Sequence, residues 1–495
     1  MPNETSAPYT LRFLNACRSF GDRPALVDAV KSYSYSELKG IVSGIMNLLT
    51  ERFPDETMIG VVDQNDVYTY ASILAINLCG KTHVPFNIRY PEEKLVVIAE
   101  KASVRIILSS YAFQCGNLHI LLTLGITGGI SEDFVPVKKS VNPAYLLFTS
   151  GSTGEPKGVP IYNHHLNAFF DFFLDGGVFY FDEKDRFLQV YETSFDVSVF
   201  SAFTPLLSGG CFYLLPRKTF AYLEIPKILS SCEITVLSMV PSMLHFLSPY
   251  FKQLRFEKLR YSFFSGDKLL NSLLQDWSTC VPHSVIVNCY GPTETTIVCS
   301  HYLWDAQKAV KDSFEGIVSI GKLFPGTNYV LRNAKEIGPG LLEGELCLCG
   351  QQVIDAYLNK ENSEKFMEWT LDGKECRFYC TGDRVRVNTE GNLLFLGRTD
   401  HQIKAGGYRV EPAEIETALR QVSGNSLCVV MGVDSLQGST QVVAFVEGKG
   451  DETELIRKLR KKLPPHCIPS RITFLDQLPL NINGKVDRRE LCKFV

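Results

Sequence analysis

Short strand-like runs alternate with helical patterns along about the first 300 residues of the chain. The runs are rich in β-branched and aromatic residues, whereas the stretches between them carry apolar residues at helical spacing, as over 71–78 and 92–102. Strands that alternate with helices form parallel sheets with helices packed on both faces. We therefore predict an α/β body, with strands over residues 59–62, 104–108, 145–148, 234–238 and 285–287.

The pattern changes after about residue 317, where strand-like runs such as 344–349 and 392–395 are separated by glycine and proline turns. This spacing predicts a small antiparallel or β-barrel-like unit. Near Asp400 a further unit begins, which we expect to be a compact α+β domain of about one hundred residues. The sequence thus predicts an N-terminal body over 1–399 and a mobile C-terminal domain over 400–495, the latter with helices over 412–419 and 452–462 and strands over 427–433 and 441–447.

The charge balance and the hydropathy of the chain exclude several classes of protein. Its 50 lysine and arginine residues and 54 aspartate and glutamate residues give a net charge of −4, whereas a nucleic-acid binder would carry a positive excess. No apolar run approaches the roughly 18 residues that span a bilayer, and the N-terminal MPNETSAPYT lacks the pattern of an export signal. We expect a cytoplasmic protein with neither a nucleic-acid nor a membrane partner.

The 15 cysteines make up about 3% of the chain, far fewer than in a disulfide-dense scaffold. They form no Cys-x-x-Cys pair, and the nine histidines form no His-Glu-x-x-His motif. Cys347 and Cys349 lie two residues apart in an apolar stretch and would share one face of a strand. We predict buried free thiols rather than a zinc site.

The most informative stretch is the glycine-rich segment over 145–159, YLLFTSGSTGEPKGV. Backbone N–H groups exposed by glycine, hydroxyl donors and a lysine together suit phosphate groups, in particular a triphosphate. The segment is not a Walker A loop, because Pro156 stands where that motif has glycine. A flexible surface turn is the alternative. The predicted phosphate-binding residues are Thr149, Ser150, Gly151, Ser152, Thr153, Gly154 and Lys157.

This loop resembles the phosphate loop of the adenylate-forming superfamily, which includes acyl-CoA synthetases, luciferases and the adenylation domains of nonribosomal peptide synthetases. Further motifs match that superfamily in the same order, and they extend across nearly the whole chain. Agreement in both order and spacing makes chance an unconvincing explanation. The matching motifs are 288–294 (NCYGPTE), 344–346 (GEL), 379–383 (YCTGD), 397–400 (GRTD) and 483–485 (NGK).

The resemblance implies that ATP and Mg²⁺ bind this chain. Glu294 would hold the metal, which prefers carboxylate and phosphate oxygens, while Thr293 contacts the α-phosphate. Asp383 would accept hydrogen bonds from both ribose hydroxyls, since a carboxylate offers two acceptor oxygens, and Arg398 would add a donor. The other residues that the resemblance assigns to the nucleotide are Tyr290 against the adenine ring, Asn288 at the base edge, and Gly266, Asp267, Cys289, Gly291, Pro292, Phe395 and Gly397 around them.

Lys485 lies in the segment LPLNINGKVDRREL, where on local grounds alone it would be a solvated charge. By resemblance it reaches the cleft from the C-terminal domain and bridges the substrate carboxylate and the nucleotide, which suits a transition state that gathers negative charge. Asp400 matches the hinge of the superfamily. A turn there would withdraw Lys485 and bring Gly406, Gly407 and Tyr408 to the cleft.

The role of Asp196 indicates which class of carboxylic acid the protein binds as substrate. Asp196 precedes an apolar run over 197–207, so a helix N-cap is one interpretation. In adenylation domains for α-amino acids, an aspartate at this place binds the substrate ammonium, and a buried ammonium needs such a countercharge. By the same resemblance the side-chain pocket is uncharged, which favours a neutral amino acid of small to medium size. With Asp196 and Lys485, the predicted substrate-binding residues are Val197, Phe200, Ser238, Phe263, Ser265, Cys289, Ile297 and Val298.

We therefore predict an enzyme that activates an amino acid as aminoacyl-AMP, releases pyrophosphate, and passes the aminoacyl group to the phosphopantetheine thiol of a carrier protein in trans. The chain ends soon after the lysine motif, so we expect a free-standing enzyme or an excised domain. A D-alanine–carrier protein ligase, an acyl- or aryl-CoA synthetase and a non-catalytic nucleotide-binding scaffold are the alternatives.

Overall fold

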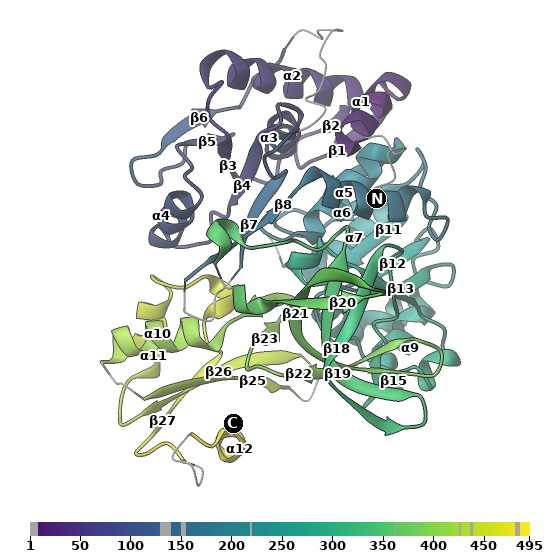
Figure 1. Ribbon diagram of the computed structural model, residues 1–495. Coiled ribbons are helices and arrows are strands. Elements are labelled where there is room, and N and C mark those ends of the chain that lie inside the picture. The colour runs from purple at the N-terminus through teal and green to yellow at the C-terminus, as the bar shows by residue number, and fades with distance from the viewer. Residues whose placement is uncertain are drawn as a thin grey trace.

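The computed structural model describes residues 8–128, 140–149, 155–217, 220–361, 363–424, 427–435, 439–480 and 486–495. Its N-terminal part is built on two sheets flanked by helices, and the C-terminal part lies beside them, at the bottom of the view in Figure 1. The larger sheet is mostly parallel. Its strands, in spatial order, are β17 (Lys322–Leu323), β14 (Ser300–Leu303), β13 (Val285–Tyr290), β12 (Tyr261–Phe264), β11 (Val236–Met239), β9 (Arg186–Gln189), β10 (Cys211–Leu214), β1 (Pro24–Val27) and β2 (Ser32–Ser34).

The second sheet is parallel except for its last pair, β7 and β8. Its strands are entirely or almost entirely buried near the centre, which explains why they appear in the sequence as continuous apolar runs. In spatial order they are β6 (His119–Leu122), β5 (Ile106–Ser109), β3 (Met58–Val62), β4 (Thr82–Phe86), β7 (Tyr145–Thr149) and β8 (Lys157–Ile161).

Helices cover these sheets, and local signals set where they begin. Ser34 and Glu37 form a reciprocal capping box at the start of α2. The carboxylate of Asp66 accepts a hydrogen bond from the Thr69 N–H, so α3 begins before the apolar run that predicted it. The helices of this part are α1 (Tyr9–Ser19), α2 (Tyr35–Arg52), α3 (Val67–Leu78), α4 (Glu92–Lys101), α5 (Asn163–Asp175), α6 (Val197–Ser208), α7 (Ala221–Ser231), α8 (Pro241–Leu247) and α9 (Asn271–Cys280).

A third sheet is antiparallel and follows the larger sheet in the chain. Its strands are β18 (Thr327–Gly338), β19 (Leu341–Gly350), β21 (Lys374–Val387) and β20 (Phe366–Leu371), and β22 (Leu393–Arg398) also pairs with β21. A short hairpin of β15 (Ser313–Phe314) and β16 (Ile317–Val318) precedes it. One continuous hydrophobic core reaches from both parallel sheets into this third sheet, so these elements form a single body.

The C-terminal part starts with a hairpin of β23 (Ile403–Ala405) and β24 (Tyr408–Val410). It continues with α10 (Pro412–Ser423), β25 (Cys428–Asp434), β26 (Thr440–Glu447), α11 (Glu452–Leu459), β27 (Arg471–Leu475) and α12 (Arg488–Leu491), and it has its own core. The predicted fold class is confirmed: parallel sheets with flanking helices, a small antiparallel unit and a small α+β unit. In the portion of the chain described above, no helix combines the length and the apolar character needed to cross a membrane.

Gly321 joins the larger sheet to the third sheet and supplies a stability prediction. Its carbonyl accepts a hydrogen bond from the Leu393 N–H at 2.9 Å, and its φ is +75°. A Cβ at this position would overlap the carbonyl oxygen of His301. We expect Gly321→Ala to lower the free energy of unfolding by more than about 3 kcal/mol, because it adds a backbone collision to the strain of a left-handed φ. Thermal unfolding and the yield of folded protein measure this loss.

Gly340→Ala is the matched control. Gly340 has a φ of +72°, but a Cβ there would meet nothing within 4 Å. It should therefore cost only the conformational penalty, about 1 kcal/mol. Equal losses in the two variants would contradict the collision with His301.

Candidate active site

Four parallel strands of the larger sheet end at one pocket. The residues that follow β9, β11, β12 and β13 include Tyr191, Val240, Ser265 and Gly291, and all four line it. Ligands in α/β proteins bind outside the carboxyl ends of parallel strands, where the chain leaves the sheet. The fold thus places these loops where a substrate site is expected.

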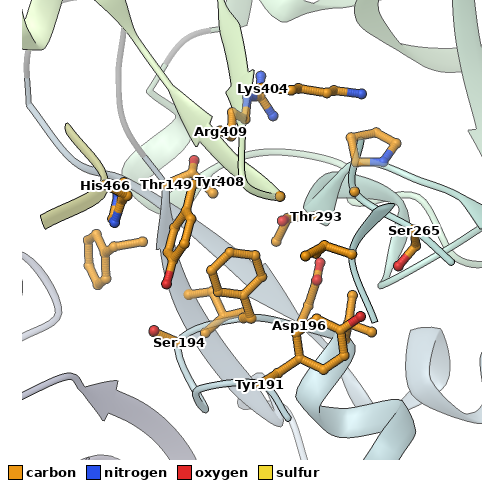
Figure 2. Close-up of a pocket in the computed structure, with 18 of the residues that line it drawn as sticks. Thr149, Tyr191, Ser194, Asp196, Ser265, Thr293, Lys404, Tyr408, Arg409 and His466 are labelled. Carbon is orange, nitrogen blue, oxygen red and sulfur yellow. The ribbon is translucent and has the colours of Figure 1, made fainter. Parts of the chain in front are cut away.

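The third sheet and the C-terminal part close the other side of this pocket. Figure 2 shows Thr149, Asp196, Thr293, Lys404 and Arg409 around the same hollow. They come from β7, the start of α6, the short helix η2 (Thr293–Thr295) and the β23–β24 hairpin. The pocket is therefore assembled from both predicted domains.

Glu294 follows Thr293, a residue of the pocket lining, and has no exposed surface. The Nη1 of Arg409 donates to both of its carboxylate oxygens at 2.9 Å, and the hydroxyl of Tyr357 donates to Oε1 at 2.6 Å. Burial opposes the charge, but Arg409 and Tyr357 outweigh it and hold the pKa of Glu294 below its ordinary value. Glu294 is thus ionised, and the guanidinium of Arg409 balances its charge.

Asp383, on β21, is a second buried carboxylate at the pocket. It accepts hydrogen bonds from the Tyr290 hydroxyl and from Nη1 of Arg398, both at 2.6 Å, and Nζ of Lys404 lies 3.8 Å away. Burial opposes its charge, yet Lys404 and Arg398 keep the pKa of Asp383 below the ordinary value. Arg398 also pairs with Asp400 at 2.7 Å, so the predicted ribose carboxylate and the predicted hinge share one arginine.

Lys404 and Arg409 reach the two carboxylates from one hairpin. They are directly opposite each other in the β23–β24 ladder, so a single element delivers both cations. The Nζ of Lys404 lies 5.4 Å from the ring centroids of Tyr290 and Phe395, within the range of cation–π attraction. Burial lowers the pKa of Lys404.

The tip of this hairpin lies at the pocket: Gly407 and Tyr408 line it, whereas Gly406 lines a neighbouring cavity. A Cβ at Gly407 would collide with the side chain of Val240, so only glycine fits this close approach. The ring of Tyr408 stacks on His466, with ring centroids 4.0 Å apart.

Two ion pairs also join the two parts of the chain: Lys94 with Glu414 at 2.6 Å and Lys268 with Asp434 at 2.9 Å.

Asp196 is buried and lines the pocket. It stands at the N-cap position of α6, but its side chain makes no capping hydrogen bond, so the alternative role as a helix cap is not supported. Burial raises its pKa to about 7 despite a hydrogen bond from Thr293. Among the residues that the structure describes, no lysine or arginine forms an ion pair with it. The pocket therefore contains an acidic group that lacks a countercharge in this part of the chain.

Only some of the residues predicted for the side-chain pocket line the cavity. Val197, Ser265 and Ile297 line it with Asp196. Phe200 and Phe263 instead pack against each other, with ring centroids 5.0 Å apart, in an aromatic cluster of the core. The buried residues Ser238, Cys289 and Val298 are likewise not among the lining residues.

The predicted nucleotide residues divide in the same way. Thr149, Gly266, Gly291, Pro292, Thr293 and Arg398 line the pocket with Asp383, whereas Asp267, Phe395 and Gly397 line an adjoining cavity that shares Arg398 and Lys404. The amide nitrogen of Asn288 donates to the carbonyls of Val318 and Ser319, so both of its hydrogens point to backbone rather than to a base edge. Lys157 is buried, and its Nζ lies 6.0 Å from the ring centroid of Tyr357. Ser150, Gly151, Ser152, Thr153, Gly154 and Lys485 lie outside the described residues.

Several residues of the site were missed in the sequence. Lys404 and Arg409 flank the predicted Gly406–Gly407 turn, and the alternation of a hairpin would have placed them opposite each other. Tyr191 follows a strand and has the pattern of an ordinary core aromatic, so no local signal separates it from packing residues. The motifs identify anions more readily than the cations that neutralise them.

The cysteines are free wherever the structure describes them, and Cys347 and Cys349 are buried as predicted, whereas Cys492 is exposed. The group Glu345, Cys347 and Cys380 does lie within 4.8 Å in a buried cluster on the third sheet. Its carboxylate is already used by Nε of Arg332 at 2.7 Å and by the Gly382 N–H at 3.2 Å. These contacts describe a structural ion pair beside two thiols.

Arg409→Ala should weaken the contact between the two parts of the chain. Removing the guanidinium leaves Glu294 as a buried charge without its cation, which typically costs about 3–5 kcal/mol. We expect a lower thermal unfolding midpoint and faster proteolysis near Asp400. Both are measured on the purified protein.

A double variant tests the electrostatic reason. Arg409→Met with Glu294→Gln removes both charges, so much of the lost stability should return. A double variant as unstable as Arg409→Ala would show that the ion pair is not the cause.

Two family models match the chain. The model described as "AMP-binding enzyme" matches residues 13–358, and the model described as "AMP-binding enzyme C-terminal domain" matches residues 414–485. Among curated relatives, tyrocidine synthase 1 of Brevibacillus parabrevis is 29% identical over 97% of this chain and 44% of its own length. Gramicidin S synthase 1 of Brevibacillus brevis is 28% identical over 94% of this chain and 42% of its own length. The chain thus spans less than half of the length of these relatives.

Solved structures resemble the whole chain. The Vibrio cholerae adenylation domain AlmE, in complex with glycyl-adenosine-5'-phosphate, is 25% identical, has a TM-score of 0.84, and aligns over 100% of this chain and 99% of its own. NpsA-ThdA from Klebsiella oxytoca, an artificially fused adenylation–PCP di-domain, has a TM-score of 0.83 at 23% identity and covers 94% of this chain and 93% of its own, which shows the fold alone. The motifs of the sequence, the carboxylates around the pocket and these matches together establish that the chain belongs to the family of AMP-binding enzymes and has the fold of an adenylation domain.

Proposed function

We propose that this chain activates a neutral α-amino acid as aminoacyl-AMP and transfers the aminoacyl group to the phosphopantetheine thiol of a carrier protein in trans. The observation that carries this proposal is Asp196, a buried carboxylate at the pocket without a cationic partner in the described part of the chain. A buried carboxylate needs a countercharge. The ammonium of an amino acid supplies one, whereas a fatty or aryl acid does not.

The similar proteins support the two halves of this proposal. AlmE was solved with an aminoacyl-adenylate, glycyl-adenosine-5'-phosphate. NpsA-ThdA joins an adenylation domain to a PCP domain. We extend both features to this chain and place the domain boundary between residues 399 and 400, with Asp400 as the hinge.

In the first step, the amino-acid carboxylate attacks the α-phosphorus of ATP in line, a new O–P bond forms, and the bond to pyrophosphate breaks. Asp196 holds the ammonium, Thr293 contacts the α-phosphate, and Asp383 holds the ribose. Lys485 would approach from the C-terminal domain and neutralise the charge that develops between carboxylate and phosphate.

Glu294 would hold Mg²⁺ when Arg409 is withdrawn from its two oxygens, because it is a buried carboxylate and carboxylate oxygens are favoured ligands of this metal. When bound, the metal would neutralise phosphate charge. The protein's own contribution is to keep Glu294 ionised, which the hydrogen bond from Tyr357 assists.

In the second step, the carrier thiol attacks the carbonyl carbon of the adenylate and AMP leaves. The arrangement in the structure suits this step, because the β23–β24 hairpin lies at the pocket and Tyr408 packs against Phe195 at 4.5 Å. A D-alanine–carrier protein ligase would use the same chemistry with one defined substrate.

Exchange of labelled pyrophosphate into ATP across a panel of acids tests the activity. We expect exchange with neutral amino acids and none with fatty or aryl acids, because only the former bring an ammonium to Asp196. Exchange driven by fatty or aryl acids alone would favour an acyl- or aryl-CoA synthetase, and no exchange with any acid would favour a scaffold. Lys485→Ala is the catalytic control and should lower exchange by about 10²–10³.

The raised pKa of Asp196 predicts a pH dependence. The group must be ionised to bind an ammonium, so binding weakens as the pH falls through about 7. Below that pH, kcat/KM for the amino acid should fall about tenfold per pH unit, with little change for ATP. Asp196→Asn should raise the amino-acid KM and abolish this dependence.

Asp66→Asn is the matched control for that experiment. Asp66 caps α3 and lines no part of the pocket, and asparagine caps helices about as well as aspartate. Its pH profile should follow that of the unchanged protein. An Asp196→Asn variant with an unaltered amino-acid KM would remove the ammonium role.

A further inference from the structure

Resting on the proposed function, we propose that Tyr191 fills the deep part of the amino-acid side-chain pocket and restricts the enzyme to very small side chains, such as those of glycine, alanine and serine. Tyr191 lines the pocket with Asp196, Val197 and Ser265. Figure 2 shows its ring beside the Asp196 side chain. A substrate whose ammonium pairs with Asp196 would therefore direct its side chain toward this ring.

The phenol of Tyr191 uses the polar partners that a substrate would otherwise use. Its hydroxyl lies 3.4 Å from Oγ of Ser238, and Ser265 lines the same pocket as Tyr191. These are the two serines that the sequence placed in the substrate pocket. Buried polar groups usually have hydrogen-bond partners. Because Tyr191 already occupies the place beside these serines, the deep part of the pocket needs no polar group from a substrate side chain.

The backbone of Tyr191 is fixed from both sides. Its N–H donates to Oε1 of Gln189 at 3.1 Å, and Nε2 of Gln189 donates to the Ser198 carbonyl, also at 3.1 Å. Its carbonyl accepts from Nη2 of Arg217 at 3.4 Å, while the same nitrogen pairs with Asp63 at 2.8 Å. The ring also stacks on Phe195, with centroids 6.2 Å apart. A substrate that displaced this side chain would break its stacking on Phe195 and the contact of its hydroxyl with Ser238.

A second cavity lies behind Tyr191. Its lining combines apolar residues such as Met239 and Met243 with charged ones such as Glu192 and Arg217. The residues that line both cavities are Tyr191, Phe195, Val240 and Tyr408. Tyr191 is thus one of the residues between the substrate pocket and this second cavity. Removing it would join the two and lengthen the substrate pocket.

Pyrophosphate exchange over a graded set of amino acids tests this inference. The unchanged protein should favour glycine, alanine or serine over leucine and phenylalanine by about tenfold or more in kcat/KM. Tyr191→Ala should raise kcat/KM for leucine, phenylalanine and tyrosine by a similar factor. Tyrosine should gain more than phenylalanine, because its phenol can use the vacated serine hydroxyls, and the added change Ser238→Ala should reduce that preference.

Two controls separate size from indirect effects. Tyr191→Phe keeps the ring and should still reject large side chains. Met243→Ala enlarges the second cavity without opening the wall and should leave the substrate profile unchanged. Circular dichroism and thermal unfolding confirm that each variant is folded.

Efficient activation of phenylalanine or leucine by the unchanged protein would overturn the inference without any variant. An unaltered profile in folded Tyr191→Ala would overturn it as well. Failure of the proposed function is a different result, since the unchanged protein would then give no exchange with any amino acid.

Discussion

The buried ion pair between Arg409 and Glu294 fixes how the two parts of the chain meet. Glu294 has no exposed surface, and an isolated anion there would carry a desolvation penalty of several kcal/mol. Two hydrogen bonds from Arg409 and one from Tyr357 compensate for it. Because Arg409 lies on β24 and Glu294 lies in the N-terminal body, the contribution of Arg409 exists only while the hairpin is seated. The contact between Lys404 and Asp383 depends on the same placement.

One hairpin therefore neutralises two carboxylates that the proposed chemistry also needs. A divalent cation and Arg409 cannot use the same two oxygens of Glu294 at the same time. Under the proposed function, Glu294 would hold the metal of the nucleotide while the hairpin is withdrawn, and Arg409 would balance the charge of Glu294 when the hairpin returns. The exchange of one cation for another would give the two arrangements that we propose for the C-terminal domain a direct electrostatic basis.

The sequence predicted the fold class and those residues of the candidate site that lie in short motifs, because these motifs stand at the ends of strands. Asp196 and Asp383 line one pocket although they are far apart in the chain. Whether a predicted residue lines the cavity or is buried in the core was not predictable. The side-chain amide of Asn288 donates to neighbouring backbone, and Phe200 packs in the core. Both contacts depend on tertiary packing, which no local sequence pattern encodes. Tyr191 escaped notice for the same reason.

The loops that follow β9, β11, β12 and β13 supply much of the lining of the pocket that we propose for the amino acid, yet they contribute little to the hydrogen-bonded ladders of the sheet. A change of side chain in such a loop alters the cavity while the strands keep their pairing. Substrate preference in this architecture can thus change through single replacements at strand ends with little penalty to folding, so related chains can evolve different specificities on the same scaffold.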